Sequence, residues 1–237
     1  MISPLEEFQS HDFSFDYRLR SLFSMIPRGG TLLDIGSGTG YIADYLGRSF
    51  SQITLSDNSG TLVDLLKRKY NSQPHIIVRK LDAENLPTDG RFDVITLCDI
   101  LEHLSNDQKS LKGCLGLLKE GGKIFISVPA FGWLYGVRDK TYGHVRRYSM
   151  RELKNLIEDS GLLIDQIYYW NFLGLIPYIV SEKLFRRPLV GPARIRPEGL
   201  VAKLVNKLIY QWLNLETKIH PPFGLSLIAV AMIKTPK

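Results

Sequence analysis

Short, almost continuous hydrophobic runs alternate with amphipathic segments through the first two thirds of the chain. Such runs are typical of strands that are buried on both faces of a sheet. They predict five strands, at Leu32–Ile35, Ile53–Leu55, Ile76–Val78, Val94–Cys98 and Ile124–Val128. The segments between them have helical spacing and predict helices at Ile42–Arg48, Gly60–Tyr70 and Asn106–Leu118. This alternation predicts an α/β fold with a parallel sheet and helices on both of its faces.

Two more strands are expected in the last third, at Ile164–Trp170 and Phe223–Ile233. Between them lies an insert, Asn171–Pro222, which is rich in aromatic, proline and basic residues and has helical spacing over Leu200–Leu215. A capping box at the start of Met150–Asp159 predicts a further helix there. The whole pattern predicts a Rossmann-like, seven-stranded, mostly parallel sheet with a helical insert before the last strand.

Glycine pairs and triplets mark several predicted boundaries. Gly121 and Gly122 separate a predicted helix from the fifth strand, as a helix C-cap would. Gly36, Gly38 and Gly40 follow the first strand directly.

The composition is that of a globular protein, with 44% hydrophobic and 23% charged residues among 237. The net charge is +6, and the segment Glu182–Lys218 holds eight basic and three acidic residues. A basic surface suits a soluble protein, an anionic membrane surface or a nucleic acid. Two cysteines, Cys98 and Cys114, give no disulfide framework, so we expect a reduced, cytoplasmic protein, with peripheral membrane contact left open. The first residues carry acids and no long apolar run, which disfavours a signal peptide.

The glycine-rich segment after the first strand is the first candidate site. Glycines let a backbone turn tightly and approach a ligand, and the helix that follows offers unpaired N–H groups. The spacing is GxGxG, which differs from the GxGxxG usual in dinucleotide enzymes. Asp34, two residues before the loop, would repel a pyrophosphate but could hold an ammonium group. An ordinary strand–helix turn is the structural alternative.

Acidic residues also follow the second and third strands. Asp57 stands where such folds bind the two hydroxyls of an adenosine ribose, although it could also cap the next helix. Asp82, followed by Ala83, could accept a hydrogen bond from an adenine amino group, or it could be a turn aspartate.

The fourth strand leads into Asp99-Ile100-Leu101-Glu102-His103. Because strand carboxyl ends form the ligand crevice in open α/β sheets, His103 could act there as a general base. Equally, Glu102 and His103 could hold the loop in place. The acids and histidines show no compact ligand spacing such as HExxH, so the sequence predicts no metal.

These segments, taken in order, resemble the class I S-adenosylmethionine-dependent methyltransferases, especially the small-molecule enzymes of the ubiquinone/menaquinone-biosynthesis-like group. The resemblance covers roughly Thr31–Pro129. It rests on LLDIGSGTG, LSDNS, KLDAENLP, FDVITLCDILEHL and LLKEGGKIFISVP. It implies S-adenosyl-L-methionine as methyl donor and S-adenosyl-L-homocysteine as product. It also implies one methyltransferase domain, with a lid at 1–28, a cofactor-binding core at 29–170, a substrate cap at 171–222 and the last strand at 223–237.

The resemblance further implies where the cofactor lies. Asp34 and the loop from Gly36 to Gly40 would hold its methionyl part, Asp57 the ribose, and Asp82 with Ala83 the adenine. Cys98 and Asp99 would line the wall near the methyl group. The cofactor set expected in full is Asp34, Gly36, Ser37, Gly38, Gly40, Asp57, Asn58, Asp82, Ala83, Cys98, Asp99, Tyr17 and Arg18.

Two flanking segments add candidates. His11–Arg18 resembles the opening of many such enzymes, whose N-terminal helix covers the cofactor, so Tyr17 or Arg18 could contact its carboxylate. Arg138–Ser149 follows the fifth strand and resembles a segment of methyltransferases of glycan or lipid pathways. The catalytic candidates are His144, His103 and Tyr148, and the expected substrate contacts are Arg146, Arg147, Trp133 and Tyr135. An Asp139–arginine ion pair is the structural alternative for this loop.

The leading functional hypothesis is therefore methyl transfer to a small molecule, apolar or lipid-linked and bearing an anionic group. Three alternatives stay open: a nicotinamide dehydrogenase, a non-catalytic S-adenosylmethionine-binding or membrane adaptor with this fold, and a nucleic-acid methyltransferase. The last is disfavoured because no (D/N)PPY-like tetrapeptide follows the fourth strand. The insert could serve as a substrate cap, as a surface that rests on anionic lipid, or as plain packing.

Overall fold

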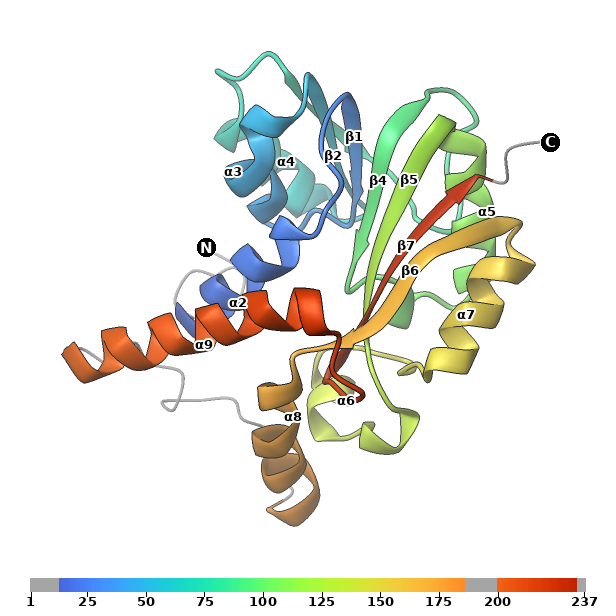
Figure 1. Cartoon of the computed structure of the whole chain (residues 1–237). Helices are drawn as coiled ribbons and strands as arrows, with labels where there is room; N and C mark the ends of the chain where they lie inside the picture. Colours follow the sequence, from blue (N-terminus) through green and yellow to red (C-terminus); the bar gives the residue numbers. More distant parts are fainter. Residues whose placement is uncertain (1–12, 186–199, 234–237) are drawn as a thin grey trace.

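A computed structural model of the chain describes residues 13–185 and 200–233 (Figure 1). Seven strands form one twisted sheet in the order β3-β2-β1-β4-β5-β7-β6. The strands are β1 (Thr31–Ile35), β2 (Gln52–Asp57), β3 (Ile76–Lys80), β4 (Phe92–Cys98), β5 (Leu118–Pro129), β6 (Leu162–Trp170) and β7 (Ser226–Ile233). Only β7 runs antiparallel to its neighbours β5 and β6. The predicted seven-stranded, mostly parallel sheet is thus confirmed.

The direction of chain winding reverses between β1 and β4. The chain passes from β1 outward to β2 and β3, then returns to pair β4 with the other side of β1. At such a reversal the loops after the two strands diverge and leave a crevice at their carboxyl ends. The loops after β1 and β4 therefore define where a ligand would enter.

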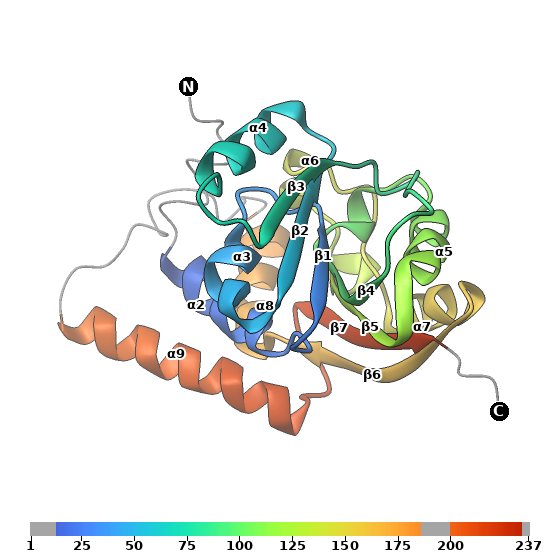
Figure 2. The ribbon, with the colours of Figure 1, turned by 90° about the horizontal axis from the view of Figure 1, so that it is seen from above.

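Helices cover both faces of the sheet. They are α2 (Phe13–Ser24), α3 (Tyr41–Leu46), α4 (Gly60–Lys69), α5 (Asp107–Leu117), α6 (Val137–Thr141), α7 (Met150–Asp159), α8 (Phe172–Ile179) and α9 (Leu200–Ile219). Successive strand side chains point to opposite faces, so Leu32 joins the core under α2, α3 and α9, whereas Leu33 joins the core under α5 and α7. Figure 2 shows these two helical layers on either side of the sheet.

The structure corrects one predicted boundary. Gly121 and Gly122 do not cap α5, which already ends at Leu117. They lie near the start of β5, where the pairing with β4 shifts register between Phe92 and Val94. Gly121 has a φ of 73° and so supplies the left-handed residue that this irregularity requires. By contrast, the predicted capping box of α7 is present, with Ser149 and Glu152 exchanging hydrogen bonds.

The described parts of the insert before β7, 171–185 and 200–222, are mainly helical, as predicted. It contains α8, the π-helical turn η4 (Val180–Leu184) and α9, which runs four residues beyond the predicted Leu200–Leu215. The buried Glu216 of α9 accepts a hydrogen bond from the backbone N–H of Phe172 at 2.9 Å and thereby ties α9 to the start of α8. Trp170 donates to the backbone carbonyl of Leu213 at 3.3 Å. In the described part of the chain, no helix is both long and apolar enough to cross a bilayer.

Candidate functional site

A cavity of about 690 Å³ lies at the carboxyl ends of β1, β2 and β4. We call it the central cavity. Its walls come from the loop after β1, the turn η2 (Leu101–His103) after β4, the segment between α6 and α7, and helices α2, α8 and α9. Volumes of 300–1,000 Å³ are about those of small-molecule and cofactor sites. The cavity thus joins segments from nearly every part of the described chain.

The glycine loop forms one end of the central cavity. Gly36, Gly38 and Gly40 have φ values of 73°, 53° and 86°, which other residues rarely adopt. A Cβ at Gly36 would also overlap the side chain of Ile100. Gly36, Ser37 and Gly38 line the cavity. Gly40 is not among its lining residues and is the N-cap of α3.

Asp34 lies beneath this loop and is almost fully buried, yet it lines the cavity. Its Oδ1 accepts a hydrogen bond of 2.6 Å from the hydroxyl of Thr96. Burial raises the pKa of its carboxyl to about 6, against the opposing effect of the hydrogen bonds from Thr96 and Ser37. A carboxyl in this state is ready to be stabilised in its charged form by a cationic ligand group.

This pKa makes a prediction about cofactor affinity. If Asp34 holds the ammonium group of the cofactor, binding requires the ionised carboxyl, so affinity should rise as pH rises through about 6. Titrating S-adenosylhomocysteine by calorimetry at pH 5 and pH 7 should show a gain of about tenfold. In the Asp34→Asn variant the affinity should be lower and this gain should disappear. A gain that persists in the variant would assign the titration to another group.

Asp57 ends β2 beside the same loop and lines the cavity. Its Oδ2 accepts from the backbone N–H of Gly38 at 3.1 Å, and its Oδ1 accepts from the N–H of Ser59 at 2.9 Å. The N-cap of α4 is Ser59, so the alternative of Asp57 as helix cap is wrong. The neighbouring Asn58 is exposed and is not among the cavity residues.

Asp82 and Ala83 do not line the central cavity. The Asp82 carboxylate accepts from the Asn85 side chain at 2.6 Å and from the Glu84 backbone at 2.9 Å. The hydrogen bond from Asn85 is the main reason that the pKa of Asp82 is lowered. These contacts are those of a turn aspartate, and they do not support the predicted adenine contact.

The end of β4 brings Cys98 and Asp99 to the cavity wall. Asp99 has a φ of 54°, and its carboxylate accepts from the Ser127 hydroxyl at 2.9 Å. The other oxygen pairs with the guanidinium of Arg18 at 3.2 Å. Burial raises the pKa of the Cys98 thiol, so it stays neutral. Through Arg18, the predicted lid helix α2 is joined to the end of β4.

Of the predicted lid motif His11–Arg18, only the side chain of Arg18 is described. Residues 11 and 12, and the side chain of Tyr17, fall outside the described residues. Leu19, Leu22 and Phe23 of α2 line the cavity, which agrees with a covering helix.

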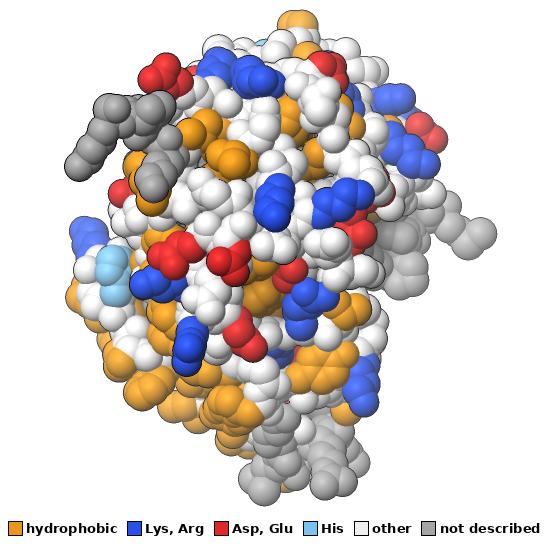
Figure 3. Space-filling view, turned by 90° about the vertical axis from the view of Figure 1, so that its right-hand side faces the viewer, with side chains coloured by type: hydrophobic (Ala, Val, Ile, Leu, Met, Phe, Trp, Pro, Cys, Tyr) orange, Lys and Arg blue, Asp and Glu red, His pale blue; other side chains and the backbone are white. Residues whose placement is uncertain are grey.

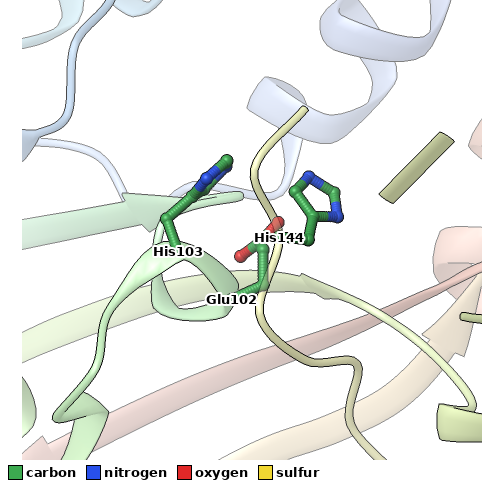
Figure 4. Close-up of side chains that lie close together, drawn as sticks. All are labelled: Glu102, His103 and His144. Carbon is green, nitrogen blue, oxygen red and sulfur yellow. The ribbon is translucent and has the colours of Figure 1, made fainter. Parts of the chain in front are cut away.

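The other end of the central cavity carries Glu102, His103 and His144. The first two belong to η2 and the third to the segment between α6 and α7, as Figure 4 shows. The two imidazole rings meet edge to face, with centroids 4.7 Å apart. Burial lowers the pKa of His103. His144 Nδ1 lies 2.9 Å from the carboxylate of Asp139.

Asp139 is fully buried and organises this segment. Both of its oxygens accept from Nε of Arg147 at 2.9 Å, and one accepts from the Gly136 N–H. Burial opposes ionisation, but the hydrogen bonds from His144 and Arg147 outweigh it and hold the pKa of Asp139 well below its ordinary value. The predicted structural alternative, an Asp139–arginine ion pair, is therefore present.

Three predicted catalytic or substrate residues are already engaged elsewhere. Tyr148 is buried, donates to Asp107 at 2.7 Å and to the Leu101 carbonyl at 3.0 Å, and does not line the cavity. Arg146 pairs with Asp107 at 2.7 Å and donates to the carbonyls of residues 104 and 105. Arg147 lines the cavity, but its guanidinium also contacts Tyr178 and the Ala130 carbonyl. These contacts fix the segment in place and do not support a substrate clamp.

Trp133 and Tyr135, which were predicted to contact substrate, also lie away from the cavity wall. Trp133 is 59% exposed, and neither residue is among those that line the cavity. Tyr135 donates its hydroxyl to the His144 carbonyl at 2.7 Å, so it positions that histidine. Arg138, Tyr142 and Tyr178 were not predicted and do line the cavity. Arg138 and Tyr142 lie within the singled-out segment Arg138–Ser149, which was the only signal that could have found them.

Comparison with known proteins now adds to this geometry. Residues 33–126, from β1 to β5, match the family described as a methyltransferase domain. This match supports a class I, S-adenosylmethionine-dependent methyltransferase domain within the chain. Over 102 residues it is 36% identical to a ubiquinone biosynthesis O-methyltransferase of Coxiella burnetii, which is 42% of this chain and 44% of the relative. The match thus spans less than half the length of that relative.

Solved structures extend the likeness of fold to almost the whole chain. One is an S-adenosylmethionine-dependent methyltransferase of Clostridium acetobutylicum, with a TM-score of 0.61, 15% identity and coverage of 93% of both chains. Another is the N-methyltransferase NodS of Bradyrhizobium japonicum in complex with S-adenosylhomocysteine, with a TM-score of 0.54, 14% identity and coverage of 98% and 89%. The predicted cofactor, S-adenosylmethionine, is confirmed for the methyltransferase domain.

Proposed function

We propose that this chain transfers the methyl group of S-adenosylmethionine to a hydroxyl oxygen of an apolar small molecule. The observation that carries the proposal is the central cavity, which runs from the Asp34 and Asp57 carboxylates to the His103 and His144 imidazoles. Groups suited to a cationic, ribose-bearing donor thus share one cavity with groups that can take a proton. The relatives named as O-methyltransferases support oxygen as the acceptor atom.

The residues of the cavity fit the cofactor in charge and shape. Asp34 offers a buried carboxylate, the glycine loop brings its backbone to the cavity wall at Gly36 and Gly38, and Asp57 lies at the tip of β2. When bound, the cofactor supplies a methyl group that is already activated by the positive sulfur. The chain would then need to align the acceptor with that methyl group and exclude water.

The histidine end of the cavity would handle the acceptor proton. Because Asp139 engages Nδ1 of His144, the Nε2 atom keeps a lone pair that can accept a proton. As the acceptor oxygen bonds to the methyl carbon, the carbon–sulfur bond breaks with its electron pair left on sulfur, and the hydroxyl proton passes to a base. Tyr148 is not proposed for this role, because its hydroxyl is buried against Asp107 and Leu101.

The proposed acceptor is apolar because of the surface beside the cavity. Leu173 and Pro177 of α8 line it, and further large hydrophobic side chains near α6 and α8 are exposed. These are Trp133, Ile176, Val180 and Phe185. Figure 3 shows hydrophobic side chains gathering toward the lower end of the molecule, whereas both signs of charge are mixed above. A membrane-dissolved acceptor could approach over this face. Arg146 and Arg147 pair with Asp107 and Asp139, so they do not support an anionic group on the acceptor.

Thermal unfolding separates this proposal from the nicotinamide alternative. At about 100 times its dissociation constant, S-adenosylhomocysteine should stabilise the chain by about 2.7 kcal/mol, which is a Tm increase of about 5–10 °C for a domain of this size. NAD at the same concentration should leave Tm unchanged. Stabilisation by NAD alone would overturn the cofactor assignment.

Transfer itself is tested with a radiolabelled methyl donor. We expect label to enter a catechol that carries a short isoprenoid chain, and not the corresponding aniline. Label in the aniline alone would contradict oxygen as the acceptor atom, and label in neither would favour the non-catalytic alternative.

A further inference from the structure

Glu102, His103 and His144 form a compact group whose ligand-type atoms all lie within 4.8 Å of one another. Figure 4 shows the three side chains turned toward a common region of the central cavity. The predicted methyl transfer uses at most one of them as a base. One carboxylate and two imidazoles at this spacing need a different explanation, because metal ions in proteins are held by such sets.

Glu102 is the least explained of the three. Its side chain is fully buried, and no other residue in the described ranges donates a hydrogen bond to either carboxylate oxygen. Burial raises its pKa well above the ordinary value, and only weaker influences, from its own backbone N–H and from the charge of Arg147, favour the charged form. The nearest buried cation, Arg147, directs its donors to Asp139, Tyr178 and the Ala130 carbonyl. A buried carboxylate without a partner is costly, and a bound cation would remove that cost.

His144 is oriented as metal-binding histidines are. Asp139, itself held by Arg147, accepts the hydrogen of His144 Nδ1 at 2.9 Å. The opposite ring nitrogen, Nε2, therefore keeps its lone pair. Metal-ligating histidines almost always donate their other N–H to a carboxylate or a carbonyl in this way, which fixes the tautomer and the ring.

His103 has a similar outer contact. The backbone of Gly143, next to His144 in the chain, lies close to its ring and favours the protonated form. The two segments are also joined directly, because the N–H of Val145 donates to the Glu102 carbonyl at 2.8 Å. Arg146 and Tyr148 add the contacts to Leu104 and Leu101 described above. The backbone thus holds all three side chains in one place before any ion arrives.

We propose that Glu102, His103 and His144 bind a divalent transition-metal ion of the zinc type at the acceptor end of the central cavity. Two histidines and one glutamate are a known ligand set of catalytic zinc, which leaves a position open for water or substrate. Small rotations of the side chains would bring each ligand atom to about 2.0–2.2 Å from a shared ion. Asp99 is not included, because Ser127 and Arg18 occupy its oxygens.

The role of the ion rests on the proposed function. With the ion bound, His144 Nε2 would be a ligand and would no longer be the base described above. An acceptor hydroxyl that ligated the ion would lose its proton at lower pH, and the proton would pass to solvent. The ion also fixes the oxygen that faces the methyl group. This assigns the acceptor class more closely, as a molecule with two adjacent oxygens, such as a catechol, that can chelate the open side of the ion.

The binding test uses the full chain, stripped of metal with a chelator and then dialysed. Calorimetric titration with Zn²⁺ should show one ion bound per chain, and Co²⁺ should give visible absorption bands from a nitrogen- and oxygen-ligated site. In Glu102→Gln, His103→Ala and His144→Ala, affinity for Zn²⁺ should fall at least 100-fold and the Co²⁺ bands should disappear. His75→Ala, a histidine outside the cavity, should bind like the unaltered chain.

Unaltered affinity for S-adenosylhomocysteine shows that each variant is folded. If the stripped chain binds no Zn²⁺, or if the three variants bind it as the unaltered chain does, the metal site is refuted. If Zn²⁺ binds at this group and no acceptor is methylated, the site stands and the proposed function fails. If the stripped chain methylates a catechol at the full rate, the assigned role of the ion is refuted.

Discussion

Replacing Asp139 with alanine is expected to lower the free energy of unfolding by about 3–5 kcal/mol. The side chains of Asp139 and Arg147 are 0% and 3% exposed, and Nε of the arginine lies 2.9 Å from both carboxylate oxygens. Removing the aspartate leaves a buried guanidinium without its counter-charge and also leaves His144 without its partner. Denaturant unfolding of the two chains measures the difference.

A surface ion pair provides the matched control. Asp165 pairs with Lys123 at 2.8 Å, but the two side chains are 30% and 36% exposed. Asp165→Ala should therefore cost less than about 1 kcal/mol. Equal losses in the two variants would contradict the view that burial makes the Asp139 pair important.

The loss in Asp139→Ala should also depend on pH. The folded-state pKa of Asp139 lies well below its ordinary value of about 3.9. A depressed pKa contributes stability that is fully present above about pH 4 and is lost as pH falls toward the folded-state value. The stability difference between the unaltered chain and the variant should therefore shrink in acid. A stability difference that stayed constant down to pH 2.5 would show that it does not come from the ionised Asp139 carboxylate.

Replacing Asp57 with alanine is expected to weaken binding of S-adenosylhomocysteine by about 10- to 100-fold. If Asp57 accepts from the ribose hydroxyls as predicted, the variant loses a charged acceptor, and hydrogen bonds to charged groups contribute about 1.5–3 kcal/mol. It also loses the contact that holds the Gly38 N–H at 3.1 Å. Calorimetric titration gives the two affinities.

The control for Asp57 is Asp64→Ala, which removes an exposed acid from α4. It changes the net charge equally and should leave affinity within about twofold. If Asp57→Ala binds as tightly as the control, its assignment to the ribose is refuted. Asp57→Asn, which keeps one acceptor oxygen, should lie between the two.

The strands and the donor end of the cavity could be predicted because their signals are local. A buried parallel strand is a continuous apolar run, and its loop follows within a few residues, so Asp34, Gly36 and Asp57 were found together. The adenine contact of Asp82 stays a prediction, because the sequence does not tell whether a carboxylate points to a ligand or to Asn85, from which it accepts in the structure. Local reasoning failed at Gly121, where a positive φ serves an irregular strand pairing and not a helix end.

The acceptor end could not be predicted in the same way. Glu102 and His144 are 42 positions apart, and their approach depends on contacts such as Val145 with Glu102 that no local pattern encodes. Arg146 and Tyr148 looked like functional residues because of their chemistry. Their partner, Asp107, lies at the start of α5, about 40 positions away, and no local pattern indicates this pairing. A search for compact ligand spacing such as HExxH could not find this group for the same reason.

The packing of α2 against α9 has one more consequence. Leu19 and Phe23 of α2 line the central cavity together with Ile209 and Leu213 of α9, so a ligand that filled this part of the cavity would contact both helices at once. Amide hydrogens in the two helices should then become protected from exchange with solvent together when a ligand binds, although the helices lie far apart in the sequence. Hydrogen exchange in two peptides far apart in the sequence would thus report whether the cavity is occupied.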